Sequence, residues 1–195
     1  MTASALQQFQ VQSQDHADSP NDQQLIASIN GGDAAAFEVL YYRHRDWVVN
    51  LAHRFTGSED LALDVMQETF IYFLKKFPGF RLTANLKTFL YPAVKNFSIT
   101  ARRKAARYQS TEAEQHALEE TATDPAMLSQ SEDLSNAMAG LSEEHREVLL
   151  LRFMDDLSLA EIAEATGIPL GTVKSRLHNA LELLRKDERT KEFFD

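Results

Sequence analysis

Apolar residues recur three and four positions apart along most of the chain, which is the spacing of one buried helix face. The pattern is clearest between residues 158 and 185, where it comprises Leu159, Ile162, Ala163, Leu177, Leu181 and Leu184. Ser158 followed by Glu161 is a Ser-x-x-Glu capping box, which starts a helix. Gly167 and Pro169 end that helix, because glycine accepts a left-handed conformation and proline cannot continue the helix. We therefore expect two helices joined by a short turn.

The second of these helices starts near Gly171 and carries polar and cationic side chains in its first turns. They are Thr172, Lys174, Ser175, Arg176 and His178. Two helices with this turn and this placement of cations predict a helix-turn-helix over residues 158–178, whose second helix can enter the major groove of DNA. The alternative is an ordinary helical hairpin inside an all-helical core. The turn chemistry and the position of the cations together favour DNA binding.

The same apolar spacing predicts further helices in the first half of the chain and therefore an all-α protein. These helices cover about residues 22–30, 33–56, 58–76 and 84–108. Asp33 and Ser58 are suited to cap the second and third of them. Trp47 falls on the apolar face of the second helix, where we expect it to be part of the core.

The helix expected over residues 58–76 has two contrasting faces. Its apolar stripe comprises Leu63, Met66, Phe70, Phe73 and Leu74. Asp64, Gln67 and Glu68 lie on the other side. From the residues alone, that polar side is either a solvated face or a surface for docking a partner.

The helix expected over residues 84–108 combines an apolar face with cations and aromatic rings. We expect it to bury Phe89, Leu90, Val94, Phe97 and Ile99. Pro92 should kink the helix or split it near Leu90. The polar and aromatic candidates on this helix are Lys87, Tyr91, Lys95, Asn96, Arg102, Arg103 and Arg107. Cations that follow phosphates and rings that stack on bases suit single-stranded DNA, although a solvated basic helix is the alternative.

The net charge of -9 would disfavour DNA binding if it were spread evenly, but it is not. Between residues 75 and 107 there are nine Lys or Arg and no Asp or Glu, whereas residues 111–135 carry seven acids and no Lys or Arg. Because salt screens charges over about 8 Å, the local basic segment decides which partners bind there. We expect the acidic segment to form an extended linker between two domains.

No catalytic, metal or cofactor site emerges from the sequence. There is no cysteine, and the six histidines are scattered without the spacing of metal ligands. Neither a phosphate-binding P-loop nor a nucleophile elbow is present. The first twenty residues lack the basic and apolar segments of a signal peptide, and no apolar run is long enough to span a membrane. We expect a cytoplasmic protein that is not an enzyme, needs no cofactor and is not inserted in a membrane.

Three segments carry a resemblance to a known family. They are DVMQETF at residues 64–70, LKTFLYPAVKNFSITARRKAAR at residues 86–107 and LSEEHREVLLLRFMDDLSLAEIAEATGIPLGTVKSRLHNALELLR at residues 141–185. In this order they resemble the polymerase-binding signature, the minus-ten promoter helix and the minus-thirty-five promoter domain of bacterial RNA polymerase sigma factors. The group with only these two domains, the extracytoplasmic-function group of the sigma-70 family, is the one that the chain resembles.

The resemblance implies a domain plan and a function. Residues 1–20 would be a disordered extension, 21–110 the domain that binds core polymerase and the minus-ten element, 111–135 the linker, and 136–195 the minus-thirty-five domain. The partners it implies are core RNA polymerase, promoter DNA and an anti-sigma factor. The sequence departs from the family pattern at Pro92. It also departs from it at Thr100, a position where the family usually has Asp.

The resemblance also assigns site residues. Those implied to bind polymerase are Asp64, Met66, Gln67, Glu68 and Phe70. Those implied to hold melted minus-ten DNA are the seven polar and aromatic candidates of residues 84–108 together with Phe80. Those implied to bind minus-thirty-five DNA are Thr172, Lys174, Ser175, Arg176 and His178.

Two other classes of function compete with a sigma factor. One is a free-standing helix-turn-helix regulator whose N-terminal half is a sensor or dimerisation module. The other is a helical enzyme with a DNA-binding appendage, which the absence of an active-site motif disfavours. Binding to core polymerase, and a preference for DNA with an unpaired minus-ten segment, distinguish a sigma factor from the regulator.

Overall fold

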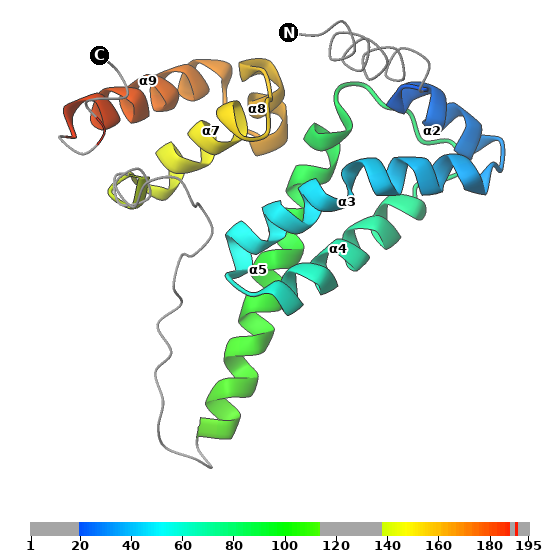
Figure 1. Ribbon diagram of the computed structural model, residues 1–195, viewed down its shortest axis with the longest axis horizontal. Coiled ribbons are helices and arrows are strands. Elements are labelled where there is room, and N and C mark those ends of the chain that lie inside the picture. The colour runs from blue at the N-terminus through cyan, green and yellow to red at the C-terminus, as the bar shows by residue number, and fades with distance from the viewer. Residues whose placement is uncertain (1–19, 114–137, 188–189, 191–195) are drawn as a thin grey trace, which may run out of the picture.

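The computed structural model describes residues 20–113, 138–187 and 190, and the described part is helical without a strand. Helices α2 (Asp22–Asn30), α3 (Ala34–Thr56), α4 (Glu59–Leu74) and α5 (Leu86–Ala113) form an N-terminal unit (Figure 1). Helices α7 (Glu143–Phe153), α8 (Leu159–Thr166) and α9 (Leu170–Lys186) form a C-terminal unit. The expectation of an all-α protein with two helical domains is confirmed.

The N-terminal unit is a bundle in which α3, α4 and α5 pack on one another and α2 packs on α3. Its core includes Leu40, Val48, Phe73, Leu90 and Val94, all fully buried. The predicted caps are present: the Asp33 carboxylate accepts hydrogen bonds from the Ala35 and Ala36 amides, and the Ser58 hydroxyl accepts one from the Leu61 amide. These caps satisfy amides that the first turns of α3 and α4 leave without a helical partner.

The C-terminal unit contains the predicted helix-turn-helix, formed by α8 and α9. Ser158 and Glu161 make the capping box at the start of α8. Gly167 ends α8 with φ 71°, a left-handed conformation in which a side chain would be strained. The buried residues Val173, Ala180 and Leu184 fix the inner face of α9, so its polar first turns point away from the core.

Three residues expected in the core of the N-terminal unit are exposed instead. The exposed fractions of Leu63, Leu74 and Ile99 are 41%, 49% and 37%. Helix α4 buries a stripe that is displaced around the helix from the predicted one and is formed by Ala62, Val65, Met66, Thr69, Phe70 and Phe73. Because α4 packs against α3 and α5 along that one side, the apolar residues at its edges remain in contact with solvent.

The expected break at Pro92 does not occur, because α5 continues through it as one helix. Leu90 and Val94 on either side of Pro92 are fully buried. Their packing against α3 and α4 holds the helix together where proline removes one backbone hydrogen bond. Helix α5 also continues to Ala113, past the boundary placed at residue 110. The rest of the predicted linker, residues 114–135, and residues 1–19 of the predicted extension lie outside the described residues.

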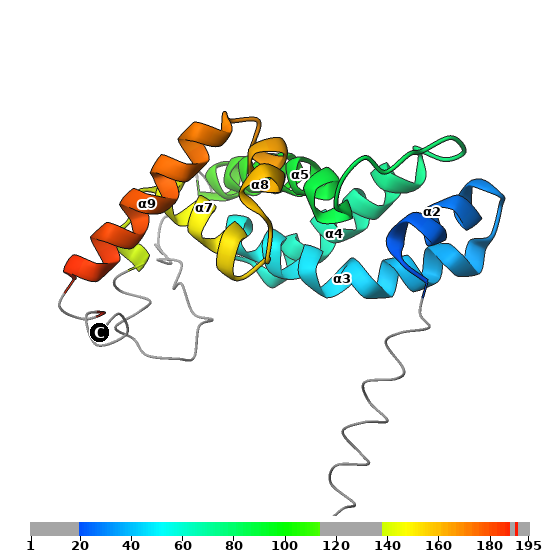
Figure 2. The same cartoon turned by 90° about the horizontal axis from the view of Figure 1, so that it is seen from above.

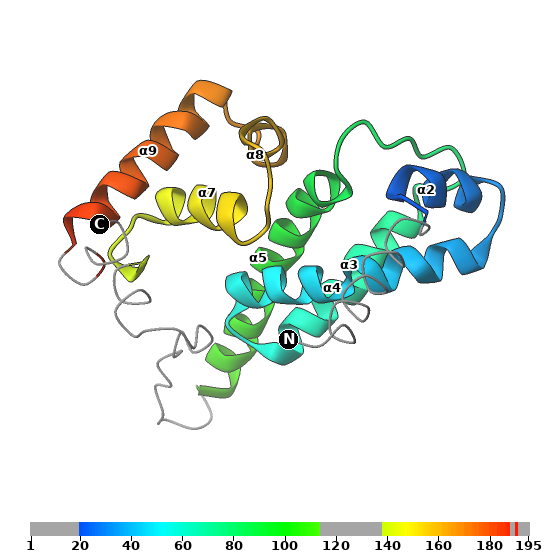
Figure 3. The same cartoon turned by 45° about the horizontal axis from the view of Figure 1, so that its top comes forward.

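The two units pack against each other. Helix α8 lies beside the N-terminal half of α5, and α7 lies beside the C-terminal end of α3 (Figures 2 and 3). Apolar residues from both units, among them Leu90, Tyr91, Leu157 and Ile162, belong to one continuous buried cluster. The C-terminal unit therefore covers one part of α5 and leaves another part uncovered.

Candidate polymerase and nucleic-acid interfaces

The outer face of α4 carries the acidic and amide side chains that the sequence singled out. Asp64, Gln67 and Glu68 are exposed and one helical turn or less apart. Met66 and Phe70 are buried beneath them, where the Tyr41 ring meets the Phe70 ring at 4.8 Å between centroids and the Tyr41 hydroxyl lies 3.6 Å from the Met66 sulfur. The two apolar candidates therefore support the face from inside instead of meeting a partner directly.

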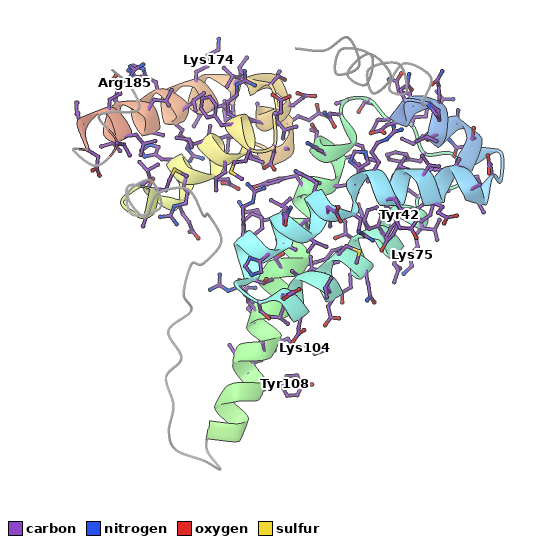
Figure 4. The ribbon with its side chains drawn as sticks, viewed as in Figure 1. Tyr42, Lys75, Lys104, Tyr108, Lys174 and Arg185 are labelled. Carbon is purple, nitrogen blue, oxygen red and sulfur yellow. The ribbon has the colours of Figure 1, made fainter. Side chains whose placement is uncertain are left out.

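Exposed apolar side chains surround this polar face, and sequence reasoning missed them. Ile71 on α4 is 53% exposed and Tyr42 on α3 is 57% exposed (Figure 4). Leu63 and Leu74 continue the row of Gln67 and Ile71 along α4, because residues three or four apart share a helix face. Exposed apolar side chains next to polar ones make a surface suited to a protein partner.

The C-terminal half of α5 extends beyond α3 and α4 as a basic arm. Arg102, Arg103 and Lys104 are exposed there (Lys104 in Figure 4), and Asn96 is exposed on the half of α5 that precedes this arm. The Arg102 guanidinium donates a hydrogen bond of 3.3 Å to the Phe55 carbonyl, which sets its direction near the end of α3. Arg107 and Tyr108 are exposed further along the same helix. This half of α5 can meet a nucleic-acid backbone without rearrangement of the N-terminal unit.

Phe80 lies in an aromatic cluster that closes the end of the N-terminal bundle. Its ring packs against Phe73, Phe77 and Phe89, with centroids between 4.7 and 5.6 Å away. Asn30 fixes the loop between α4 and α5 by donating to the Phe80 carbonyl at 2.8 Å and accepting from the Gly79 amide at 2.6 Å. The half-buried Phe80 therefore positions this loop, and its ring is engaged with other rings.

The N-terminal half of α5 is engaged by the C-terminal unit. The Tyr91 hydroxyl and the Lys95 ammonium both donate hydrogen bonds to the Glu147 carboxylate on α7. Lys87 donates a hydrogen bond of 3.0 Å to the Asp155 carbonyl. Burial, together with the negative charge of Glu147, raises the pKa of Tyr91. In this arrangement three of the predicted DNA-binding residues face acidic residues of the same chain.

Trp47 and Arg54, which sequence reasoning did not assign to a site, meet Asp155 at the same contact. The Trp47 indole N–H donates to Asp155 Oδ1 at 2.8 Å, and one Arg54 nitrogen donates to both carboxylate oxygens at 2.8 and 2.6 Å. The Trp47 ring is half-buried between the units instead of lying in the core of one. No sequence pattern pairs these residues, because Asp155 lies more than 100 positions further along the chain.

Helix α9 presents the predicted minus-thirty-five residues in its first turns. Lys174, Ser175 and His178 are exposed, and Thr172 is half-buried. Arg176 differs from them because its guanidinium is paired with the Glu144 carboxylate of α7 at 2.7 Å. An arginine held in this way reaches DNA only by exchanging or sharing that carboxylate.

Neither a metal site nor a membrane span is found in the described part of the chain. Within residues 20–113 and 138–187, no three His, Asp or Glu side chains gather in a way that could hold a metal ion. None of the helices there is both long enough and apolar enough to cross a bilayer.

Comparison with known proteins assigns both units. Residues 40–108 match the family described as Sigma-70 region 2, and residues 137–186 match Sigma-70, region 4. The sigma factor SigW of Bacillus subtilis is 30% identical over 177 residues, which cover 84% of this chain and 95% of SigW. The sigma-E factor of Escherichia coli K12 is 33% identical, with 84% of this chain and 92% of the relative covered.

Solved structures give the same assignment of the fold. The sigma factor RpoE of Bartonella quintana, solved with the anti-sigma factor NepR, has a TM-score of 0.57 at 25% identity and covers 77% of this chain and 94% of its own. CnrH, solved with the cytosolic domain of CnrY, has a TM-score of 0.60 at 22% identity. The match covers 83% of this chain and 93% of CnrH. With two matched regions in family order and close relatives along most of its length, the chain belongs to the extracytoplasmic-function RNA polymerase sigma factors.

Proposed function

We propose that this sigma factor divides promoter recognition among three surfaces of its two units. The exposed face of α4 docks on core RNA polymerase, α5 holds melted minus-ten DNA, and the first turns of α9 bind minus-thirty-five duplex DNA. The observation that carries the proposal is the exposed basic segment of α5, which has no acid up to Arg107 and lies on a different unit from the helix-turn-helix. Two separate basic surfaces suit two separate DNA elements.

The α4 face suits a helical protein partner. Asp64, Gln67 and Glu68 supply charge and hydrogen bonds, and the exposed Ile71 and Tyr42 supply apolar area. A polar centre with aromatic and aliphatic neighbours is the composition of an interface that gains both specificity and affinity. Met66 and Phe70 keep α4 rigid from below, so the outer residues are held ready for the partner.

The α5 surface suits an unpaired strand. Arg102 and Arg103 would follow its phosphates, since both guanidiniums lie on the exposed side of the helix. Asn96 lies exposed between Lys95 and Arg102, and its amide can both donate to and accept from the edge of a flipped base. Phe80 and Asn30 would hold the loop that borders the strand.

The α9 surface suits duplex DNA. Lys174 and Ser175 would bind phosphates, and Arg176 and His178, within the next turn of the recognition helix, would read base edges. Glu144 pairs with Arg176 and would orient its guanidinium until DNA replaces the carboxylate. Arg176 would then supply part of the sequence preference.

The partners follow from these surfaces and from the relatives. RpoE of Bartonella quintana binds an anti-sigma factor, and we propose that this chain has an anti-sigma partner as well. It works as a binding factor in the cytoplasm with no reaction of its own, because polymerisation chemistry resides in core polymerase. No cofactor or metal is part of the mechanism.

The test is run-off transcription with purified core polymerase over a library of randomised promoters. The chain should yield transcripts from one promoter class, with information at both the minus-ten and minus-thirty-five positions. Core polymerase alone should not select that class. Duplex binding without polymerase, and no gain in specific transcripts when polymerase is present, would instead identify a free-standing regulator.

A further inference from the structure

We propose that the C-terminal unit closes the minus-ten surface of the free chain, with the Glu147 carboxylate and the Asp155 backbone carbonyl occupying donors on α5 that DNA phosphates later take. The inference rests on the proposed function, since it concerns the regulation of the same α5 surface. The closed state is the one in which Glu147 and Asp155 engage α3 and α5. The open state is the one that binds minus-ten promoter DNA.

Asp155 is the centre of the contact. It is 4% exposed, although it lies in the turn between α7 and α8, where acidic residues normally face water. Its carboxylate accepts from Trp47 and, through both oxygens, from Arg54. Asp156, the next residue, adopts φ 58° and so turns the chain sharply after Asp155. The turn therefore delivers one carboxylate into the N-terminal unit and leaves the next one in solvent.

The carboxylate of Asp155 has no role inside its own unit that the structure records. Among the described residues, its hydrogen-bond donors both lie on α3. The turn itself is held by the backbone, with the Asp155 amide donating to the Leu150 carbonyl and the Leu157 amide donating to the Leu151 carbonyl. A buried charge whose partners lie on another unit stabilises the contact between the units and not the fold of either.

Glu147 supplies the second contact. Its carboxylate accepts from the Tyr91 hydroxyl and from the Lys95 ammonium, both on α5. Glu161 on α8 faces Asn85 and Lys87 near the start of α5, and these neighbours add to the Ser158 hydrogen bonds that lower the pKa of Glu161. Acidic residues of three neighbouring segments thus face the cations of one surface.

The closed contact and DNA binding exclude each other on physical grounds. Lys87 and Lys95 cannot hold Asp155 or Glu147 and an oncoming phosphate with the same donor hydrogens. Tyr91 is 1% exposed, so its ring meets a base only after α7 moves away. Every partner that needs this half of α5 therefore binds only the open fraction, and its apparent affinity falls by that fraction.

The chain offers two built-in advantages for a test. It has no cysteine, so Ala27→Cys on α2 and Asn179→Cys on α9 give a unique pair of dye sites, both exposed. It also offers matched acids in the same unit: Asp156 is 95% exposed on its side chain, and Glu164 on α8 is exposed too. Asp155→Asn with Glu147→Gln removes the closing carboxylates, and Asp156→Asn with Glu164→Gln makes the same change in net charge elsewhere.

Energy transfer between the dyes and affinity for single-stranded minus-ten DNA are measured on the full chain with each pair of substitutions. We expect the closing pair to lower energy transfer and to strengthen DNA binding about 10-fold, as the open fraction rises. The matched pair should leave energy transfer unchanged and affinity within about twofold. Trp47→Phe, which removes one donor from the opposite side, should act in the same direction as the closing pair at unchanged helicity.

The outcomes separate this inference from the proposed function. Equal effects of the two pairs on affinity would mean that net charge alone explains the change, and would overturn the inference. Lower energy transfer with unchanged affinity would overturn it too. Unchanged energy transfer in the closing pair and in Trp47→Phe would also overturn it. If the unaltered chain failed to bind core polymerase at all, the proposed function would fail, while the energy transfer would still report whether these acids close the units.

Discussion

The two halves of α5 have the same kind of sequence and different surroundings. Both halves carry cations and α5 has no acid before Glu112, yet Lys87 and Lys95 are engaged by the C-terminal unit while Arg102 and Arg103 are exposed. The difference comes from Glu147 and Asp155, which lie 52 to 68 positions away from those lysines. A basic segment in a sequence therefore shows capacity to bind an anion, and the fold decides which anion is bound.

The same contrast extends to the other candidate surfaces. The α4 face is exposed along its whole length, like the C-terminal half of α5. Arg176 on α9 is engaged by Glu144, like the N-terminal half of α5, although that partner lies within its own unit. Substitutions on exposed surfaces should therefore lower affinity for the partner by the full value of the lost contact. Substitutions at residues engaged by another part of the chain should lower it less, because the internal contact that competes with the partner is lost as well.

The largest effect is expected on the α4 face. Gln67→Ala combined with Glu68→Lys should weaken core-polymerase binding about 30-fold, because it reverses a charge at the centre of an exposed docking surface. The free energy of unfolding should change by less than about 0.5 kcal/mol, since both side chains are solvent-exposed. Titration against core polymerase and chemical denaturation measure the two quantities. Native stability with native affinity would remove this face from the mechanism.

A somewhat smaller effect is expected on the exposed half of α5. Arg102→Ala with Arg103→Ala should weaken binding of the polymerase complex to single-stranded minus-ten DNA on the order of 10-fold at low salt. The slope of log affinity against log salt should fall by about 1.4, which is about 0.7 for each lost phosphate contact. Titrations at several salt concentrations give the slope. An unchanged slope would mean that these arginines do not touch phosphates.

Arg176→Ala should weaken binding to minus-thirty-five duplex DNA by roughly 1 kcal/mol, at the low end of the range for an arginine that reads a base. The loss is moderated because Arg176 must give up Glu144 before it reaches the DNA. Binding of the polymerase complex to single-stranded minus-ten DNA should not change. Paired titrations against the two DNAs check this, with Glu144→Gln as the companion variant. If the Arg176 variant weakened both DNAs equally, the two elements would share one binding surface.

The smallest effect is expected at the engaged half of α5. Lys87→Ala with Lys95→Ala should change affinity for minus-ten DNA within about threefold, although it removes as many cations as the arginine pair. The variant loses two contacts to DNA and also loosens the closed state, and these effects oppose each other. The same salt titration measures it. A loss as large as that of the arginine pair would show that the closed contact does not compete with DNA.

Local sequence signals predicted the elements of this fold well, and contacts between distant segments were beyond them. Asp33, Ser58, Ser158 and Gly167 end or begin helices where expected, because capping depends on neighbours in the chain. Leu63, Leu74 and Ile99 were wrongly expected in the core, since periodicity identifies an apolar face but not which of its edges the neighbouring helices cover. Of the two outcomes expected at Pro92, a kink or a split, the split does not occur, because tertiary packing outweighs one hydrogen bond.

The candidate sites show the same limit. The exposed positions of Gln67, Asn96 and Lys174 agree with the pattern that selected them. Trp47 and Arg54 escaped notice because their partner, Asp155, belongs to the other unit. Tyr91 was chosen as an aromatic ring beside cations, and the structure instead buries it against Glu147. Sequence spacing gives the face of a helix, and only the packed structure gives what covers that face.

Energy transfer between dyes on Ala27→Cys and Asn179→Cys, compared in the free chain and in the promoter complex with core polymerase, tests the central claim most directly. We predict higher transfer in the free chain than in the complex with polymerase and promoter DNA, because α5 must exchange Glu147 and Asp155 for DNA. Equal transfer in the two states would contradict it, since the C-terminal unit would then still cover α5 in the complex that reads the minus-ten element.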